Sequence, residues 1–112
     1  MNDEEVFLYL TTRGRKTGLP RRIEIWFVEL GGRHYVVSEG RERAGWVQNL
    51  TKDGAVQLSV GPRGAEEGVL PLTAAVARLV DPLAEPELAV AVSAAMDAKY
   101  DWSDGLIVEL RR

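Results

Sequence analysis

The sequence contains no cysteine and only one histidine, His34. Disulfides and thiolate metal sites are therefore excluded, and a zinc or haem site would need unusual ligands. No apolar run is long enough to cross a bilayer, and the acidic start Met1–Glu5 lacks the basic residues of a secretory signal. We therefore expect a cytoplasmic protein with no membrane span and no metal centre.

The chain is 112 residues long, which suits a single domain over residues 1–112 and leaves no room for a second hydrophobic core. Hydrophobic residues make up 46% and charged residues 28%, a balance typical of globular proteins and not of disordered ones. The formal net charge of -3 argues against general nucleic-acid binding, although it leaves room for a local basic site.

Apolar and polar residues alternate with the period of a β-strand through much of the chain, and Gly31-Gly32 is typical of a tight hairpin turn. The sequence predicts six strands, at Val6–Thr12, Arg21–Leu30, Arg33–Ser38, Ala55–Val60, Val69–Val80 and Gly105–Leu110. A helical period predicts a short helix over Ala44–Lys52 and a longer one over Pro86–Lys99. Trp26, inside the second predicted strand, is expected in the core and not as a cofactor platform, although it shares with Glu24 a strand face that is expected to be only partly buried.

Strands joined by hairpins indicate an antiparallel sheet and not alternating parallel units. Six short strands in so small a chain favour a compact barrel, because closure removes exposed sheet edges. The predicted fold is therefore mainly β (α+β), a six-stranded antiparallel barrel with one short and one longer helix.

The segment Thr11–Arg22, which contains the loop between the first two predicted strands, carries five basic residues and no acidic one: Arg13, Arg15, Lys16, Arg21 and Arg22. An anion is the natural partner, because glycines let backbone N–H groups approach phosphate and arginine offers a bidentate fork. A solvated loop is the alternative that charge alone leaves open. The segment is not an ATP-binding P-loop, since Gly14–Thr17 lacks the upstream glycine and the Gly-Lys-Thr order and is not followed by a helix.

The segment Leu10–Arg21, with the sequence LTTRGRKTGLPR, resembles the phosphate-binding signature of the deazaflavin-dependent nitroreductase family. Two further matches follow at suitable spacing, the strand that ends at Val37-Ser38 and the helix Trp46–Leu50, in place of the family's Trp-Tyr-x-Asn-Leu. The resemblance implies an FMN-binding-like split β-barrel. It also implies an enzyme that binds the deazaflavin coenzyme F-420 and transfers a hydride from it to an electron-poor small-molecule acceptor, such as a quinone or a nitro compound.

The same resemblance assigns cofactor-binding roles to eight residues: Arg15, Lys16, Thr17, Arg21, Val37, Ser38, Trp46 and Asn49. The basic side chains would hold the phosphate and acidic tail of the cofactor, and the backbone near Val37 and Ser38 would face its ring. Trp46 and Asn49 would support the loop or the ring from the short helix. Tyr100 falls where the family places its acceptor pocket and is the candidate catalytic proton donor, with packing at a helix end as the alternative.

The chain departs from the family pattern at two places. Ile23-Glu24-Ile25 stands where a proline is common, and Glu39–Arg43 replaces a glycine-paired stretch. A carboxylate near an anionic cofactor is unfavourable unless an arginine pairs with it. FMN therefore stays open as the cofactor, as does a non-catalytic protein that binds flavin, haem or another small ligand. A nucleic-acid module is disfavoured because the basic loop lacks interleaved aromatics. Related barrels pair, so a homodimer is a further expectation.

Overall fold

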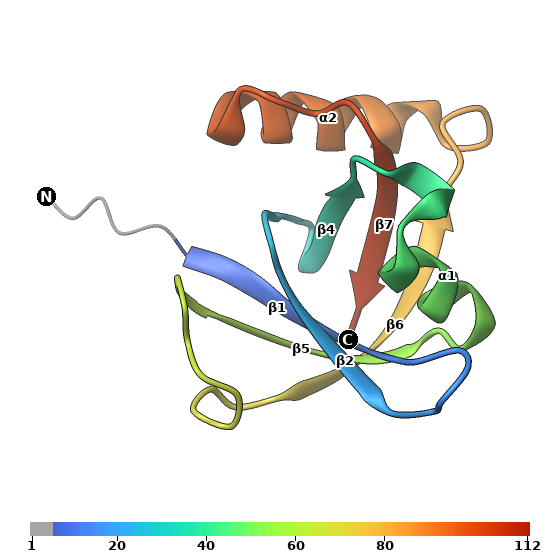
Figure 1. Cartoon of the computed structure of the whole chain (residues 1–112). Coiled ribbons are helices and arrows are strands. Elements are labelled where there is room, and N and C mark those ends of the chain that lie inside the picture. The colour runs from blue at the N-terminus through green and yellow to red at the C-terminus, as the bar shows by residue number, and fades with distance from the viewer. Residues whose placement is uncertain (1–5) are drawn as a thin grey trace, which may run out of the picture.

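The computed structural model describes residues 6–112 (Figure 1), so the acidic start behind the expectation of a cytoplasmic protein lies outside the described residues. Residues 6–112 form seven strands, β1 (Val6–Arg13), β2 (Pro20–Ile25), β3 (Val28–Leu30), β4 (Arg33–Ser38), β5 (Ala55–Pro62), β6 (Thr73–Val80) and β7 (Leu106–Arg111). The helices are α1 (Gly45–Lys52) and α2 (Pro86–Tyr100), with a 3-10 turn, η1 (Arg41–Arg43), before α1. Neither α-helix in this part of the chain has the length and apolar character to span a bilayer.

The strands form one antiparallel sheet in the order β2-β1-β5-β6-β7-β4-β3, so β2 and β3 are its two edges. This confirms the prediction of a mainly β, antiparallel fold with one short and one longer helix. The predicted closure is wrong, because no ladder joins β2 to β3 among residues 6–112. The predicted number of six strands is also wrong, because the segment Arg21–Leu30 is interrupted at Trp26-Phe27. Its first half pairs with β1 and its second half with β4, so the chain must leave one edge before it joins the other.

The predicted strand Val69–Val80 also begins later than expected, at Thr73. Pro71 has no N–H to donate to a sheet ladder, and Gly68 has a φ of +87° that a strand does not use. The preceding segment folds back over β5, where the Leu70 side chain lies so close to Gly61 that an added Cβ would come within 2.4 Å of it. A side chain at position 61 would therefore require the Leu70 side chain to move.

The sheet has a hydrophobic cluster on each face, as the alternation of side chains along a strand demands. Val36 of β4 and Val108 of β7 point into the curled sheet, where they pack with Leu8 and Leu10. Their sequence neighbours point to the other face, where α2 covers them with Ala89, Val92 and Met96. Figure 1 shows α2 lying across one end of β4 and β7, with α1 beside β6. The two helices therefore flank the end of β4, where the predicted ring-binding residues lie.

Candidate functional site

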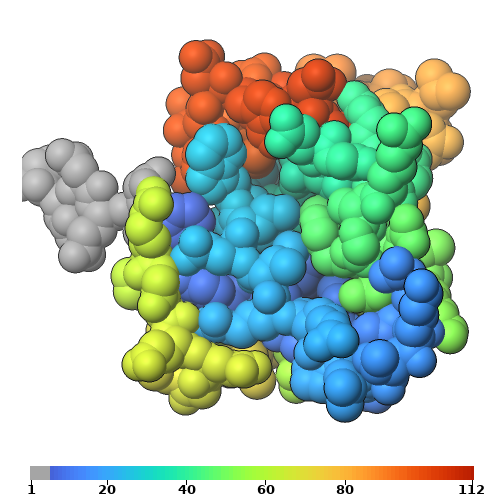
Figure 2. Space-filling model, in the orientation of Figure 1, coloured from blue at the N-terminus to red at the C-terminus, as the bar shows by residue number. Residues whose placement is uncertain are grey.

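Two adjoining cavities share the side chain of Trp46. The basic cavity, of about 500 Å³, is lined by the β1–β2 loop and α1, and includes Arg15, Lys16, Thr17, Arg21, Trp46 and Asn49. The aromatic cavity, of about 580 Å³, lies at the end of β4 and includes Trp26, Val37, Ser38, Trp46 and Trp102. The space-filling view shows the residues of β2, in light blue, beside those of η1 and α1, in green, on this face (Figure 2). The structure thus places all eight predicted cofactor-binding residues around the two cavities.

The loop of the basic cavity is held in a tight hairpin by its own main chain. The Gly14 N–H donates to the Leu19 carbonyl at 2.8 Å, and the Gly18 N–H donates to the Gly14 carbonyl at 2.8 Å. Gly18 has a φ of +74°, a left-handed conformation that favours glycine. A Cβ on Gly14 would come within 2.9 Å of the Thr17 hydroxyl, so the turn leaves no room for a side chain there. The glycines therefore set the position of the basic residues between them.

Asn49 ties this loop to α1 and is only 5% exposed. Its amide oxygen accepts from the backbone N–H of Arg15 at 3.1 Å and from the Arg15 guanidinium at 2.9 Å. Its amide nitrogen donates to the hydroxyl of Thr12 at 3.1 Å. Lys52, one helical turn further along α1, donates to the Arg15 carbonyl at 2.9 Å. A single buried amide therefore fixes the direction in which Arg15 leaves the loop.

The positive charges of the loop are compensated unequally. Arg13 forms an exposed ion pair with Asp53 at 3.4 Å. Within residues 6–112, the side chains of Lys16 and Arg21 form no ion pair and no hydrogen bond, and Arg15 is bound only by uncharged oxygens. Three cations thus line one cavity without an acidic partner, and such a group is suited to bind an anion with several charged oxygens.

Two main-chain features shape the end of β4. Ser38 is buried, its hydroxyl donates to the Arg41 carbonyl at 3.0 Å, and Gly105 approaches it so closely that a Cβ would lie 2.4 Å from the Ser38 carbonyl oxygen. The Arg41 guanidinium reaches Asp104 at 2.8 Å, which links η1 to the segment before β7. Because the Ser38 hydroxyl is engaged, β4 offers the cavity mainly its backbone here.

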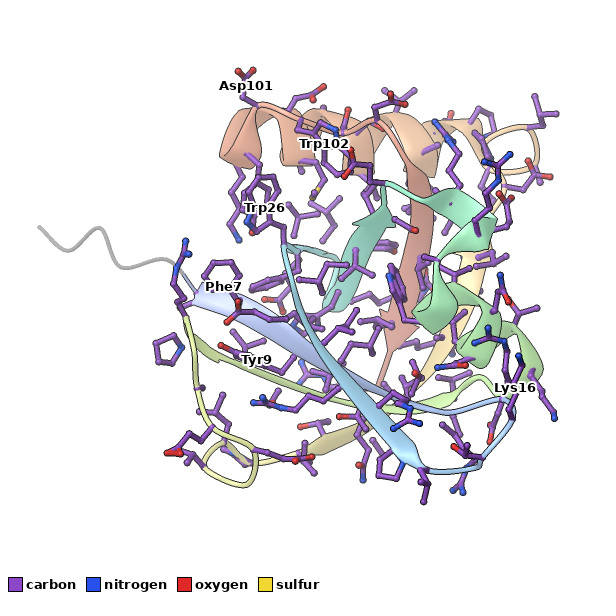
Figure 3. All side chains as sticks on the ribbon, viewed as in Figure 1. Phe7, Tyr9, Lys16, Trp26, Asp101 and Trp102 are labelled. Carbon is purple, nitrogen blue, oxygen red and sulfur yellow. The ribbon has the colours of Figure 1, made fainter. Side chains whose placement is uncertain are left out.

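The aromatic cavity is walled by tryptophans from three segments of the chain. Trp26 is 38% exposed, so its expected place in the core is wrong. Its ring stacks on that of Tyr100, with centroids 4.5 Å apart and planes 4° from parallel, and Trp102 packs edge-on against it at 6.4 Å. Figure 3 labels Trp26 and Trp102 below α2, with Lys16 on the opposite side of the view. The two cavities therefore differ in chemistry, one cationic and one aromatic.

Tyr100, the predicted proton donor, does not join the other candidates. Its hydroxyl donates to the Phe27 carbonyl at 2.9 Å and accepts from the Phe27 N–H at 3.1 Å. The residue does not line the aromatic cavity, where Trp26 stands in front of it. The structure therefore places Tyr100 behind the wall of the site.

Glu24 is a departure from the family pattern that lies close to the aromatic cavity. Its carboxylate accepts hydrogen bonds from the Gly64 N–H at 2.8 Å and from the Tyr9 hydroxyl at 2.6 Å. These hydrogen bonds and the charges of Arg63 and Arg22 lower the pKa of Glu24. The carboxylate is thus stabilised on the outer side of the sheet by partners of its own.

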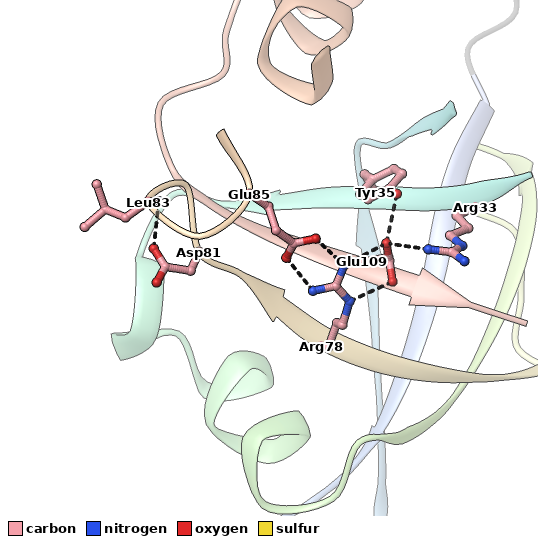
Figure 4. A network of polar contacts seen from close by, with 7 residues as sticks. All are labelled: Arg33, Tyr35, Arg78, Asp81, Leu83, Glu85 and Glu109. Atoms are coloured by element: carbon pink, nitrogen blue, oxygen red, sulfur yellow. Dashed lines mark hydrogen bonds and ion pairs between the residues drawn. The ribbon is translucent and has the colours of Figure 1, made fainter. Parts of the chain in front are cut away.

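A second arginine cluster lies on the face of the sheet that α2 covers, and its charges are fully compensated (Figure 4). The carboxylate of Glu109, 1% exposed, accepts from Arg78 at 2.9 Å, from the Tyr35 hydroxyl at 2.9 Å and from Arg33 at 3.3 Å. Arg78 also forms a two-pronged pair with Glu85 at 2.6 and 2.9 Å. This closed network leaves no free charge for a ligand.

The geometry above agrees with the comparison against protein families. The model of the F420H(2)-dependent quinone reductase family matches residues 2–101. The chain belongs to this family. Membership implies a deazaflavin-dependent oxidoreductase, and the matched residues include every lining residue of both cavities except Trp102. No curated protein gives a significant sequence match.

Solved structures share the split-barrel-like fold at low sequence identity. The haem storage protein HutZ from Vibrio cholerae has a TM-score of 0.73 and 19% identity, over 97% of this chain and 82% of that one. A conserved hypothetical protein from Mycobacterium tuberculosis has a TM-score of 0.67 and 20% identity, over 95% of this chain and 73% of that one. An FAD-binding protein from Mesorhizobium loti has a TM-score of 0.69 and 10% identity, over 96% of this chain and 80% of that one. At these identities the likeness shows the fold alone.

Among the tryptophans of the aromatic cavity, sequence reasoning misplaced Trp26. Its place in the mostly apolar stretch Ile23–Val28 predicts a core position. The signal that pointed the other way is the glutamate two positions before it, since side chains at i and i+2 of a strand share a face. A tryptophan beside a charged residue on one face is typical of a partly exposed wall.

Proposed function

We propose that the protein is a reductase that binds the deazaflavin coenzyme F-420 across the two cavities and reduces a quinone or a nitro compound. The observation that carries the proposal is the unequal compensation of charge, because Arg15, Lys16 and Arg21 line the basic cavity without an acidic partner among residues 6–112. An aromatic cavity of about 580 Å³ adjoins them at Trp46. A cofactor with an anionic tail and a flat ring has the matching chemistry at each end.

The residues present fit such a group. Arg15, Lys16 and Arg21 would hold the phosphate and the acidic tail, and Thr17 would offer its hydroxyl beside them. The backbone at Val37 and Ser38 would face the ring. When bound, the deazaflavin supplies the hydride, and the protein contributes charge, orientation and exclusion of water.

The chain's own groups are arranged to orient a ligand and not to attack one. The side-chain amide of Asn49 is engaged by Arg15 and Thr12, so its contribution is to hold the loop against α1. Trp46 stands at the junction of the cavities and would separate the charged end from the ring end. Tyr100 stays a predicted proton donor that the geometry does not favour, because its hydroxyl engages Phe27. A cytoplasmic location and a homodimer also stay predictions.

The second candidate is FMN in place of deazaflavin, or a carrier that binds a flavin or haem without turnover. The observation in its favour is Glu39, an exposed carboxylate on the lining of the aromatic cavity, which disfavours the more highly charged of the two cofactors. Both alternatives use the same cavities.

Parallel fluorescence titrations of the purified protein with F-420 and with FMN test the proposal. We expect micromolar or tighter binding of the deazaflavin, followed by oxidation of its reduced form when a quinone or a nitro compound is added. Tight binding of FMN alone would move the protein to the flavin alternative. Binding without turnover would make it a carrier.

A further inference from the structure

The junction between the two edge strands of the sheet lies next to the aromatic cavity. The edge strands β2 and β3 follow one another in the chain, but no ladder joins them, and Trp26-Phe27 is the junction. Main-chain groups at such a junction need hydrogen-bond partners from elsewhere, because buried N–H and C=O groups are costly when unpaired. Phe27 is 6% exposed, so its main-chain N–H and C=O need hydrogen-bond partners from the protein.

The last turn of α2 supplies those partners. The Tyr100 hydroxyl accepts from the Phe27 N–H at 3.1 Å and donates to the Phe27 carbonyl at 2.9 Å. The Lys99 ammonium donates to the same carbonyl at 2.9 Å and lies 4.1 Å from the centre of the Phe27 ring. Both polar main-chain groups of one junction residue are therefore held by side chains more than 70 positions away in the sequence.

The same turn fixes the orientation of Trp26. The Tyr100 ring stacks on the indole in a nearly parallel arrangement, and Trp102 packs edge-on against it. Asp101, with a left-handed φ of 57°, ends the helix and reverses the chain so that Trp102 returns to the cavity (Figure 3). Trp26 and Trp102 line the aromatic cavity while Tyr100 does not, so the tyrosine backs the indole from behind.

We propose that Trp26 is the platform on which a flat aromatic acceptor stacks, and that Tyr100 and Lys99 are positioning residues that hold it by clamping Phe27. A large apolar ring with a fixed orientation favours a planar ligand, because offset stacking requires parallel faces. An electron-poor ring suits the electron-rich indole. The inference rests on the proposed function for the direction of hydride transfer, but binding of the acceptor ring does not need the cofactor.

Two measurements test the platform, one without cofactor and one with it. The first is calorimetric titration of the cofactor-free protein with 1,4-naphthoquinone. The second is the steady-state KM and kcat for 1,4-naphthoquinone with reduced F-420, alongside the Kd for F-420. The variants are Trp26→Ala, Trp26→Leu and Tyr100→Phe, and the matched control is Tyr35→Phe, which also removes one tyrosine hydroxyl that is hydrogen-bonded in the fold.

We expect Trp26→Ala and Trp26→Leu to weaken naphthoquinone binding and to raise KM by about tenfold, with a smaller change in the Kd for F-420, whose tail the basic cavity would hold. Tyr100→Phe keeps the stacked ring but loses both contacts to Phe27, so we expect a rise of about threefold in KM with kcat preserved. Tyr35→Phe should change neither constant. This split between KM and kcat is not the signature of general destabilisation, which would affect cofactor and acceptor together.

Naphthoquinone affinity that stays at the wild-type value in both Trp26 variants would overturn the platform. A fall in kcat with an unchanged KM in Tyr100→Phe would overturn the positioning role and make Tyr100 the proton donor instead. If the wild-type protein fails to bind F-420, the proposed function fails, and the naphthoquinone titration still decides the platform separately.

Discussion

The molecule has two clusters rich in basic residues, and they differ in what surrounds the charge. In the network around Glu109, Arg33 and Arg78 meet buried or partly buried carboxylates at 2.6 to 3.3 Å. In the basic cavity, Lys16 and Arg21 meet no acidic partner within the described part of the chain. The first cluster stabilises the fold, and the second is available for a ligand. A basic cluster therefore indicates a binding site only where the fold leaves its charges uncompensated.

The substitution Arg78→Met tests whether the cluster around Glu109 stabilises the fold, and we expect it to have the largest effect on stability. The substitution leaves the buried carboxylate of Glu109 with only the 3.3 Å contact from Arg33 and the Tyr35 hydroxyl, and a buried charge that loses a charged partner is costly. We expect a loss of about 3 kcal/mol in the free energy of unfolding. Urea unfolding followed by circular dichroism measures it.

The control is Arg111→Met, because the exposed Arg111 forms no ion pair among residues 6–112. It should change the free energy of unfolding by less than about 0.5 kcal/mol. Binding of F-420 should survive Arg78→Met at temperatures where the variant is folded. A loss of cofactor affinity in the folded variant would mean that the two clusters are not separate.

A second prediction concerns Asn49, a buried residue that lines the basic cavity. Asn49→Ala removes a buried amide that binds Arg15 and Thr12, so we expect about 1.5 kcal/mol less stability and a severalfold weaker affinity for F-420. Thermal unfolding and fluorescence titration of the same sample measure both. Gln48→Ala on the exposed side of α1 is the control, and an Asn49→Ala variant with unchanged cofactor affinity would contradict the loop-holding role.

A third and smaller effect is the pH dependence of the compensated cluster. Burial acts to raise the pKa of Glu109, but hydrogen bonds from Arg78 and Tyr35 outweigh it and the pKa is lowered; Arg78 likewise lowers the pKa of Glu85. Both pKa values lie below the ordinary value of 4.5, so the folded state binds fewer protons than the unfolded state in acid. The stabilisation is full above about pH 4.5 and is lost as the pH falls through the folded pKa values.

Urea midpoints between pH 7 and pH 3 measure this dependence. Arg78→Met should flatten the curve, because that guanidinium contributes to lowering both pKa values. Equal slopes in the wild type and the variant would show that other carboxylates dominate the acid unfolding.

The strands and helices were predictable from sequence where the pattern is local. Period-two alternation located β4 to the residue, and Gly31-Gly32 predicted the turn before it. The break at Trp26-Phe27 was not predictable, because each half of Arg21–Leu30 continues the alternation and only the identity of the pairing partner changes. Pairing partners are long-range information that a single strand does not carry.

The candidate site shows the same limit. The basic loop and α1 were found from sequence because their residues lie within continuous motifs. The wall formed by Trp26 and Trp102, with Tyr100 behind it, joins segments about 75 positions apart. The contacts of Glu109 with Arg33 and Arg78 span 76 and 31 positions. Sequence alone could not separate compensated arginines from free ones, because compensation is a property of the folded chain.

Whether the uncompensated cations of the basic cavity bind the cofactor is tested most directly by the affinity for F-420 of Lys16→Glu, compared with that of Arg111→Glu. Both variants change the net charge equally, but only Lys16 lines the basic cavity. If the uncompensated cations hold the anionic tail, Lys16→Glu should weaken binding by about thirtyfold or more, because a charge-assisted hydrogen bond is replaced by repulsion. Arg111→Glu should bind as the wild type does. Equal affinities in the two variants would show that the basic cavity does not hold the anionic tail of F-420.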